Sequence, residues 1–306
     1  MKILIFGSKG MVGSSVSRSL GQDSKYELIL SNREETDLFN LEETKKLIRD
    51  IKPDVVVNAA AKVGGIYANN TQRYSFIVDN LKINLNILES CKAFSNIKII
   101  NLGSSCIYPL NAVNPITEKE FMNGKLEPTN SPYAMAKLSA IEIGNSMTFE
   151  FGHKIINLMP TNLYGPYDYF SDSNSHVIPG LMQRMHKAKT NNEQEFLIWG
   201  SGKPLREFLH VDDLASAIKK VIEVETNESL INVGSSQEIS IKELAELLKK
   251  VIGYDGLLGF DESKPDGNPR KLLDSTKILD LGWRPEIDLS QGLLDTYEWF
   301  KKNISL

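Results

Sequence analysis

Two short segments of this 306-residue chain carry side chains suited to acid-base chemistry. In SPYAMAK, Tyr133 and Lys137 are four residues apart, so both would lie on one face of a helix. A phenol with an ordinary pKa near ~10 transfers protons poorly at neutral pH, but an ammonium group held nearby favours its phenolate. The spacing suggests a tyrosine activated by a lysine, although a plain pair on a helix surface would have the same pattern.

The segment NLGSSCIYP supplies a second group, because Ser104 and Cys106 directly follow the apolar run KIINL. If the strand continues through them, their side chains share a face and point the same way at its carboxyl end. Ligands of parallel sheets bind at that end. A small buried thiol is the alternative interpretation of Cys106. The other cysteine, Cys91, forms no CxxC pair with it, so we expect two reduced thiols and no metal site.

Apolar runs that alternate with helical patterns would position these residues. The runs KILIF, YELIL, DVVVNAA, IKIINL and KIINLMP are separated by longer stretches, which is typical of βαβ units in a parallel sheet. After Pro160 the pattern loosens into turn-rich segments with helices between them. The sequence predicts an α/β fold with two domains. Residues 1–165 would form a doubly wound parallel sheet (Rossmann), with a return segment near 205–235, and residues 166–306 a smaller, partly interleaved C-terminal α/β substrate domain.

The composition excludes several classes of partner. The chain is 41% hydrophobic and 24% charged, as in ordinary globular proteins, and its net charge is −4. A small negative net charge gives the protein no broad attraction to nucleic acid or to an anionic membrane. No apolar run approaches the ~20 residues that span a bilayer, and the first residues do not read as a signal peptide. We therefore expect a cytoplasmic protein with no nucleic-acid and no membrane partner.

A glycine-rich turn, GSKGMVG, directly follows the first apolar run. Gly7 would permit the tight turn, Gly10 would let the backbone approach a pyrophosphate, and Gly13 would let helix pack on strand. The amino terminus of that helix would face the phosphates. A glycine turn before any helix looks similar, but the position after the first strand favours a dinucleotide site. Further candidate cofactor contacts are Met11, Val12 and Ala60.

The second apolar run ends in LILSNREE, without the early Asp or Glu that usually holds the ribose hydroxyls of NAD. Arg33 and Lys9 could together clamp a 2′-phosphate, for which a carboxylate would be repulsive. The pattern therefore favours NADPH over NADH. Glu34 and Glu35 keep open the alternative that Arg33 is a solvated loop charge.

Eight short segments follow one another along the chain: GSKGMVG, AAKVGGI, NLGSSCIYP, SPYAMAK, MPTNLYGP, SNSHVIPG, WGSGKPLREFLHVDD and KPDGNPRKLLD. By these segments and their order, the chain resembles the GDP-L-fucose synthase family. These are the GDP-4-keto-6-deoxymannose 3,5-epimerase-4-reductases of the extended short-chain dehydrogenase/reductase superfamily. The resemblance extends from Met1 to about Asn303. Its most specific part is the joint presence of SSCIYP and SNSHVIPG.

The resemblance implies roles for five residues. Ser104 and Tyr133 would bind the sugar's carbon-4 carbonyl, and Tyr133 would donate a proton while NADPH delivers hydride. Lys137 would hold the nicotinamide ribose and lower the pKa of Tyr133. Cys106 would be the base, and His176 the acid, that exchange the protons on carbons 3 and 5, which the neighbouring ketone acidifies. Considered alone, His176 would be an unremarkable polar residue at the start of a helix.

Cations in the second half of the chain would suit a nucleotide-sugar diphosphate. The candidates are Arg184, Lys187, Arg206, Lys264 and Arg270, with Trp199 against the base. Arg206 is favoured because WGSGKPLREF matches the family's substrate loop, whereas each of the others alone would be a solvated charge. The chain departs from the family in GPYDYF, where Tyr167 and Tyr169 replace a histidine and an asparagine near the expected sugar pocket. Lys9 also stands where arginine is usual.

The leading hypothesis is an NADPH-dependent carbon-4 reductase of a GDP-4-keto-6-deoxy sugar that also catalyses 3,5-epimerisation. One alternative is a reductase that receives an already epimerised GDP-4-keto sugar, such as a heptose. Another is a non-catalytic NADP(H)-binding sensor, which the joint presence of Ser104, Tyr133 and Lys137 disfavours. Apolar-faced helices around residues 74–94 and 133–151 resemble those through which this superfamily dimerises, so we expect a homodimer.

Overall fold

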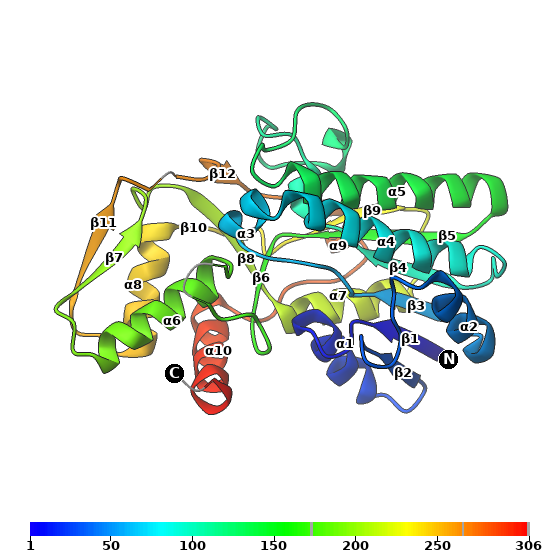
Figure 1. Ribbon diagram of the computed structural model, residues 1–306, viewed down its shortest axis with the longest axis horizontal. Helices are drawn as coiled ribbons and strands as arrows, with labels where there is room; N and C mark the ends of the chain where they lie inside the picture. Colours follow the sequence, from blue (N-terminus) through cyan, green and yellow to red (C-terminus); the bar gives the residue numbers. More distant parts are fainter. Residues whose placement is uncertain (172–173, 265, 305–306) are drawn as a thin grey trace.

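The computed structural model describes residues 1–171, 174–264 and 266–304 (Figure 1). Its main layer is a six-stranded sheet in the order β2-β1-β3-β4-β5-β9, in which every neighbouring pair is parallel. The strands are β1 (Lys2–Phe6), β2 (Glu27–Ser31), β3 (Val55–Asn58), β4 (Lys98–Leu102), β5 (Lys154–Pro160) and β9 (Leu230–Val233). The doubly wound parallel sheet that the alternating apolar runs predict is confirmed.

Helices cover both faces of this sheet (Figure 1). One face holds α1 (Met11–Gly21) and α7 (Val211–Glu223), and the other α2 (Leu41–Ile51), α4 (Arg73–Cys91) and α5 (Ser131–Phe151). Within β1, Ile3 and Ile5 pack toward the α1 side, and Leu4 and Phe6 toward the α4 side. Because both faces are buried, the strands are continuous apolar runs. Among the described residues, no helix is long and apolar enough to cross a membrane.

A second, smaller unit contains most of the chain after β5. Its sheet joins β6 (Asn162–Tyr164), β8 (Leu205–His210), β10 (Glu238–Ser240) and β12 (Arg270–Lys271), while β7 (Glu195–Trp199) pairs with β11 (Leu257–Asp261). All of these strands except β12 share a separate apolar core with α6 (Val177–Thr190), α8 (Ile241–Ile252) and α10 (Leu289–Asn303). The shorter elements are α3 (Ile66–Thr71), η1 (Ser105–Ile107), η2 (Glu118–Glu120) and α9 (Thr276–Asp280). From this half of the chain, α7 and β9 return to the main sheet.

Local signals set the limits of α5, the helix that contains Tyr133 and Lys137. Pro132 lies in its first turn, where the missing N–H costs no helical hydrogen bond. Gly152 ends the helix in the left-handed region with φ 71 and donates its N–H to Thr148 O. The helix therefore has a fixed register, and Lys137 lies on the face that it buries against the sheet.

A chain of buried amides joins three central strands. Asn58, Asn101 and Asn157 are neighbours in the register of β3, β4 and β5. Asn58 Nδ2 donates to Asn101 Oδ1 at 3.0 Å, and Asn101 Nδ2 donates to Asn157 Oδ1 at 3.0 Å. Asn58 Nδ2 also donates to Asn84 Oδ1 of α4 at 2.9 Å, so the chain of amides reaches a covering helix. All four side chains are buried, and buried amides need such partners.

Replacing the middle member of this chain of amides should destabilise the fold. Asn101→Ala leaves Asn157 Oδ1 without its donor, and one such buried group costs about 1–3 kcal/mol. We expect the free energy of unfolding, measured by urea denaturation, to fall by about that amount. Asn96→Ala, in an exposed turn, is the control and should change it by less than about 0.5 kcal/mol. Equal stability of the two variants would contradict the structural role of the amides.

Candidate active site

In the turn after β1, the backbone of the glycine-rich segment packs directly against the backbone of neighbouring segments. Gly7 has φ +75, and a Cβ atom there would lie 2.8 Å from the nitrogen of Ala60, after β3. A Cβ atom on Gly13 would lie 2.2 Å from Gly7 O, so α1 packs directly on the turn. Chain order reverses between β1 and β3, the place where open α/β sheets bind dinucleotides. Met11 and Val12 open α1, whose N-cap Gly10 provides no side-chain cap, so the first N–H groups of the helix are available to a pyrophosphate. These residues therefore fit a dinucleotide.

Lys9 and Arg33 lie beside this turn in different surroundings. Lys9 Nζ is 2.5 Å from Glu34 Oε2, so a carboxylate already compensates its charge. The exposed Arg33 guanidinium lies 5.6 Å from the centre of the Phe39 ring. The predicted clamp by both cations is not preformed. Arg33 is the better placed of the two for a 2′-phosphate, because Lys9 would first have to leave Glu34.

The strand that leads to Ser104 and Cys106 ends earlier than expected. β4 ends at Leu102, and Ser104 caps the 3-10 turn that follows by accepting the Cys106 N–H at 3.3 Å. The expectation that both side chains share one face of a strand is therefore wrong. They nevertheless lie together, since the turn brings the Ser104 hydroxyl into hydrogen-bonding contact with the Cys106 thiol.

α5 brings Tyr133 and Lys137 to the same strand end. Lys137 Nζ donates to Leu102 O at 2.6 Å and lies 5.7 Å from the centre of the Tyr133 ring. Burial lowers the pKa of Lys137 to about 8 and raises the pKa of Tyr133 well above its ordinary value. Burial is the largest influence on the pKa of Tyr133 and the charge of Cys106 acts in the same direction, so the lowering by Lys137 that the resemblance implies stays a prediction. A phenol that stays protonated suits a proton donor.

The Cys106 thiol is buried beside a lysine that sequence analysis does not single out. Burial raises the pKa of Cys106, and the charge of Lys271 is the strongest opposing influence. The effect is mutual, because a Cys106 thiolate opposes the lowering of the Lys271 pKa by burial. Lys271 lies in β12, opposite Arg206 of β8. Its segment, KPDGNPRKLLD, belongs to the resemblance and could have drawn attention to it.

His176 comes from the smaller unit. It directly precedes α6, and its ring makes no capping hydrogen bond to that helix. Two residues earlier, Asn174 O accepts the Gly65 N–H at 2.8 Å. A Cβ atom on the adjacent Gly64 would lie 3.1 Å from Phe76, whose ring meets the Tyr133 ring edge-on. These contacts bring the His176 segment to the phenol side of the site. The His176 side chain itself is exposed to solvent.

Three of the predicted substrate-binding residues lie around β7 and β8. The Arg184 guanidinium is 4.5 Å from the centre of the Trp199 ring, which remains 47% exposed. Arg206 Nη1 donates to Asn268 O at 2.5 Å, and burial lowers the pKa of Arg206. Its charge in turn lowers the pKa of Lys271. The exposed Trp199 indole suits a nucleobase, and the Arg184 and Arg206 guanidinium groups suit a diphosphate.

The other predicted cations have different environments. Arg270 makes a bidentate ion pair with Glu238, with contacts of 2.8 and 2.6 Å, so its charge is already compensated. Lys187 lies partly buried in the last turn of α6. Lys264 is exposed after β11, and its N–H donates to Asp261 O. The structure thus commits Arg270 to an ion pair rather than to a substrate.

The two tyrosines of GPYDYF have different surroundings. The Tyr167 ring lies 5.0 Å from the Trp299 ring and 5.6 Å from the Arg18 guanidinium, measured to ring centres. Tyr167 therefore connects α1 with α10. Tyr169 is 63% exposed.

The glycine turn and the Ser104, Tyr133 and Lys137 cluster on a parallel sheet are typical of dinucleotide-dependent enzymes that act on nucleotide sugars. Residues 3–234 match the NAD dependent epimerase/dehydratase family, and the chain belongs to it. Within that family, it belongs to the GDP-L-fucose synthases. It is 46% identical over 303 residues to GDP-L-fucose synthase 1 of Arabidopsis thaliana, an alignment that covers 99% of this chain and 94% of that protein.

Solved structures agree with this assignment. A GDP-L-fucose synthetase from Naegleria fowleri bound to NADP has a TM-score of 0.90 and 30% identity, over 99% of this chain and 94% of that one. A GDP-mannoheptose C4 reductase from Campylobacter jejuni with NADP bound has a TM-score of 0.86 and 34% identity, over 98% of each chain. The predicted family and fold are confirmed.

Removing the positive charge beside Cys106 should make its thiolate harder to form. We expect Lys271→Met to raise the pH at which Cys106 ionises, because burial would then act with less opposition. Lys271→Arg keeps the charge and should stay close to the unsubstituted protein. Ultraviolet absorbance of the thiolate, followed against pH without substrate, measures this. The same titration in the Cys106→Ser background supplies the signal to subtract. An unchanged midpoint in Lys271→Met would contradict the pairing.

Proposed function

We propose that this protein uses NADPH to reduce carbon 4 of a GDP-4-keto-6-deoxy sugar and also epimerises carbons 3 and 5, as a GDP-L-fucose synthase. The observation that carries the proposal is the Ser104, Cys106, Tyr133 and Lys137 cluster at the end of β4. The cluster combines two groups that can hold a carbonyl oxygen with a base beside them. The 46% identity to a GDP-L-fucose synthase over nearly the whole chain supports the same activity.

Epimerisation requires a proton to leave one face of the sugar and another to arrive at the opposite face. Cys106, as thiolate, would remove the proton beside the ketone. Hydrogen bonds from Ser104 and Tyr133 would stabilise the enolate oxygen that forms. His176, which approaches from the other unit, would return a proton.

Reduction uses the same oxygen-binding pair. NADPH, bound over the glycine turn, supplies the hydride for carbon 4. Tyr133 then protonates the carbon-4 oxygen, and its raised pKa keeps that proton on the phenol until it is needed. Lys137 is fixed by the Leu102 carbonyl beside the Tyr133 ring, and the remaining N–H groups of its ammonium would hold the cofactor ribose.

A reductase without epimerase activity is the second candidate function. The 34% identity to a GDP-mannoheptose C4 reductase favours it, since that protein's name describes reduction alone. The closer identity to GDP-L-fucose synthase 1 and the cationic partner of Cys106 favour the bifunctional activity.

Deuterium incorporation without NADPH distinguishes the two functions. GDP-4-keto-6-deoxymannose is incubated with the protein in heavy water, and deuterium is located by NMR and mass spectrometry. We expect uptake at carbons 3 and 5, slowed about 10²-fold or more by Cys106→Ser and reduced by His176→Asn, the usual range for loss of an acid or base. Cys91→Ser, at the other buried cysteine, is the matched control and should retain exchange. A protein that reduces an epimerised ketone but incorporates no deuterium is a reductase alone.

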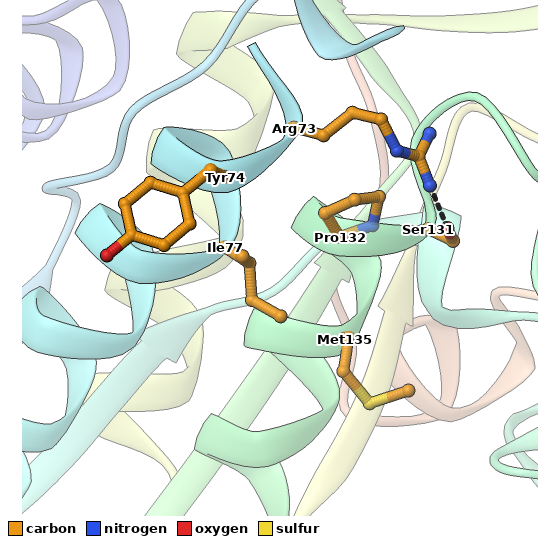
Figure 2. A pocket seen from close by; sticks show the side chains of 6 residues that line it. All are labelled: Arg73, Tyr74, Ile77, Ser131, Pro132 and Met135. Carbon is orange, nitrogen blue, oxygen red and sulfur yellow. Dashed lines mark hydrogen bonds between the residues drawn. The ribbon is translucent and has the colours of Figure 1, made fainter.

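We also propose that a second copy of this chain covers the outer face of α4 and α5. Figure 2 shows Tyr74 and Ile77 of α4, with Pro132 and Met135 of α5, around a shallow groove of about 340 Å³. Tyr74 is 79% and Met135 46% exposed. Leu85, eleven residues after Tyr74, is exposed on the same side of α4. An exposed apolar face of this kind is typical of an interaction surface, and the parallel helices α4 and α5 can pack against the same helices of a second copy about a twofold axis.

Charges placed on this face should separate the copies. We expect the unsubstituted protein to be a dimer by light scattering coupled to size exclusion, and Tyr74→Glu/Met135→Glu to be a monomer because dimerisation would bury the new carboxylates. Leu257→Glu, at a 71% exposed leucine of β11, is the matched control and should remain a dimer. A monomeric unsubstituted protein, or a dimer that survives the double substitution, would contradict the proposed interface.

A further inference from the structure

Gly65 lies where the loop after β3 contacts the segment that leads to His176. The Gly65 N–H donates to Asn174 O at 2.8 Å. A Cβ atom on Gly65 would lie 2.3 Å from Ser175 O and 3.3 Å from Asn174 O. Non-bonded carbon and oxygen atoms do not approach to 2.3 Å, so any side chain at this position would force the two backbones apart. Gly65 directly precedes α3 (Figure 1).

The backbone conformation does not explain this glycine. Gly65 has φ −68 and ψ −179, an extended conformation that every residue adopts. A substitution would therefore add no strain to the loop itself. Its whole effect would come from the space that Ser175 and Asn174 occupy. The glycine is needed for the close approach of the two segments, not for a turn.

The loop on the Gly65 side is held firmly. Asn69 Nδ2 donates to both Gly64 O and Gly65 O, at 2.7 and 3.0 Å. Upstream, Asn80 accepts the Lys62 N–H and donates to Lys62 O, both at 3.0 Å. Buried side-chain amides thus fix this loop to α3 and α4. When the two segments are forced apart, the loop has little freedom to move.

The opposite segment transmits the displacement to His176. Ser175 directly precedes His176, and Ser175 Oγ donates to Ser171 O at 2.5 Å. The His176 carbonyl accepts the Gly180 N–H at 3.0 Å, so His176 already belongs to the hydrogen-bonded start of α6. A shift of Ser175 therefore moves the first turn of α6, and the imidazole moves with it.

We propose that Gly65 is a positioning residue that sets where His176 stands against the sugar, and that it thereby governs epimerisation but not carbon-4 reduction. This inference rests on the proposed function, in which His176 returns the proton. The separation of the two effects follows from the geometry. The atoms nearest the Gly65 Cβ position all belong to Asn174 and Ser175, whereas Ser104 and Tyr133 lie on the β4 turn and α5.

The test compares both half-reactions in Gly65→Ala. Deuterium exchange without NADPH reports epimerisation, and NADPH oxidation with an already epimerised GDP-4-keto sugar reports reduction. We expect exchange to slow by about 10²-fold, the scale for a small misplacement of a catalytic group, while reduction stays within about threefold. Gly21→Ala is the matched control, because a Cβ atom there would meet only Leu28, at 3.8 Å. It should leave both half-reactions unchanged.

A double-mutant cycle separates positioning from general damage. If Gly65 acts through His176, adding Gly65→Ala to His176→Asn should slow exchange no further. Additive losses, equal slowing of exchange and reduction, or an unaffected Gly65→Ala would each overturn the inference. Those results leave the proposed function intact, because the unsubstituted protein still exchanges and reduces. Absence of deuterium uptake by the unsubstituted protein would instead defeat epimerisation itself, and this inference with it.

Discussion

The register of β3, β4 and β5 is the constraint on which the candidate site depends. Asn58, Asn101 and Asn157 hydrogen-bond in a row across these strands. A slip by one residue would turn each amide to the other face and leave buried polar groups without partners, so the row admits one alignment. That alignment fixes which carbonyl ends β4 and hence where Lys137 finds Leu102 O. The geometry of the catalytic cluster thus depends on this row of buried amides.

Within the cluster, burial disfavours the charged form of each side chain, and neighbouring charges oppose this effect at some of them. Burial alone would leave Cys106 a thiol, Tyr133 a phenol and Lys137 an amine. Burial is the largest influence on both the cysteine and the tyrosine and raises both pKa values, but only at the cysteine do neighbouring cations, Lys271 first, oppose it. The site therefore favours ionisation of the thiol over ionisation of the phenol beside it. A base and an acid acting near the same carbonyl need this difference.

Much of the fold could be predicted from the sequence, because it follows from patterns among neighbouring residues. Continuous apolar runs indicate strands covered on both faces, and the glycine turn marks the dinucleotide end. The end of β4 at Leu102 escaped prediction, since a 3-10 turn through SSCI has no period that separates it from a strand. The position of Lys271 beside Cys106 could not be predicted for another reason. It depends on how β12 pairs with β8, and local residue patterns do not show which distant strands pair.

The smaller unit contributes its cations and His176 to a site that is built mainly on the six-stranded sheet. Strand β8 carries one of these cations and also anchors the segments on either side of it. Neighbouring residues of a strand point to opposite faces. Arg206 lies opposite Lys271, on the side of the cations, while the fully buried Glu207 points the other way. Glu207 accepts the Ser236 N–H at 2.8 Å and the Leu273 N–H at 3.0 Å, and so holds the segments on either side of β8. Because Leu273 lies two residues after Lys271, the carboxylate that binds its N–H also anchors the strand that presents the Lys271 ammonium. The position of the charge beside Cys106 therefore depends on Glu207, a buried group on the opposite face of β8.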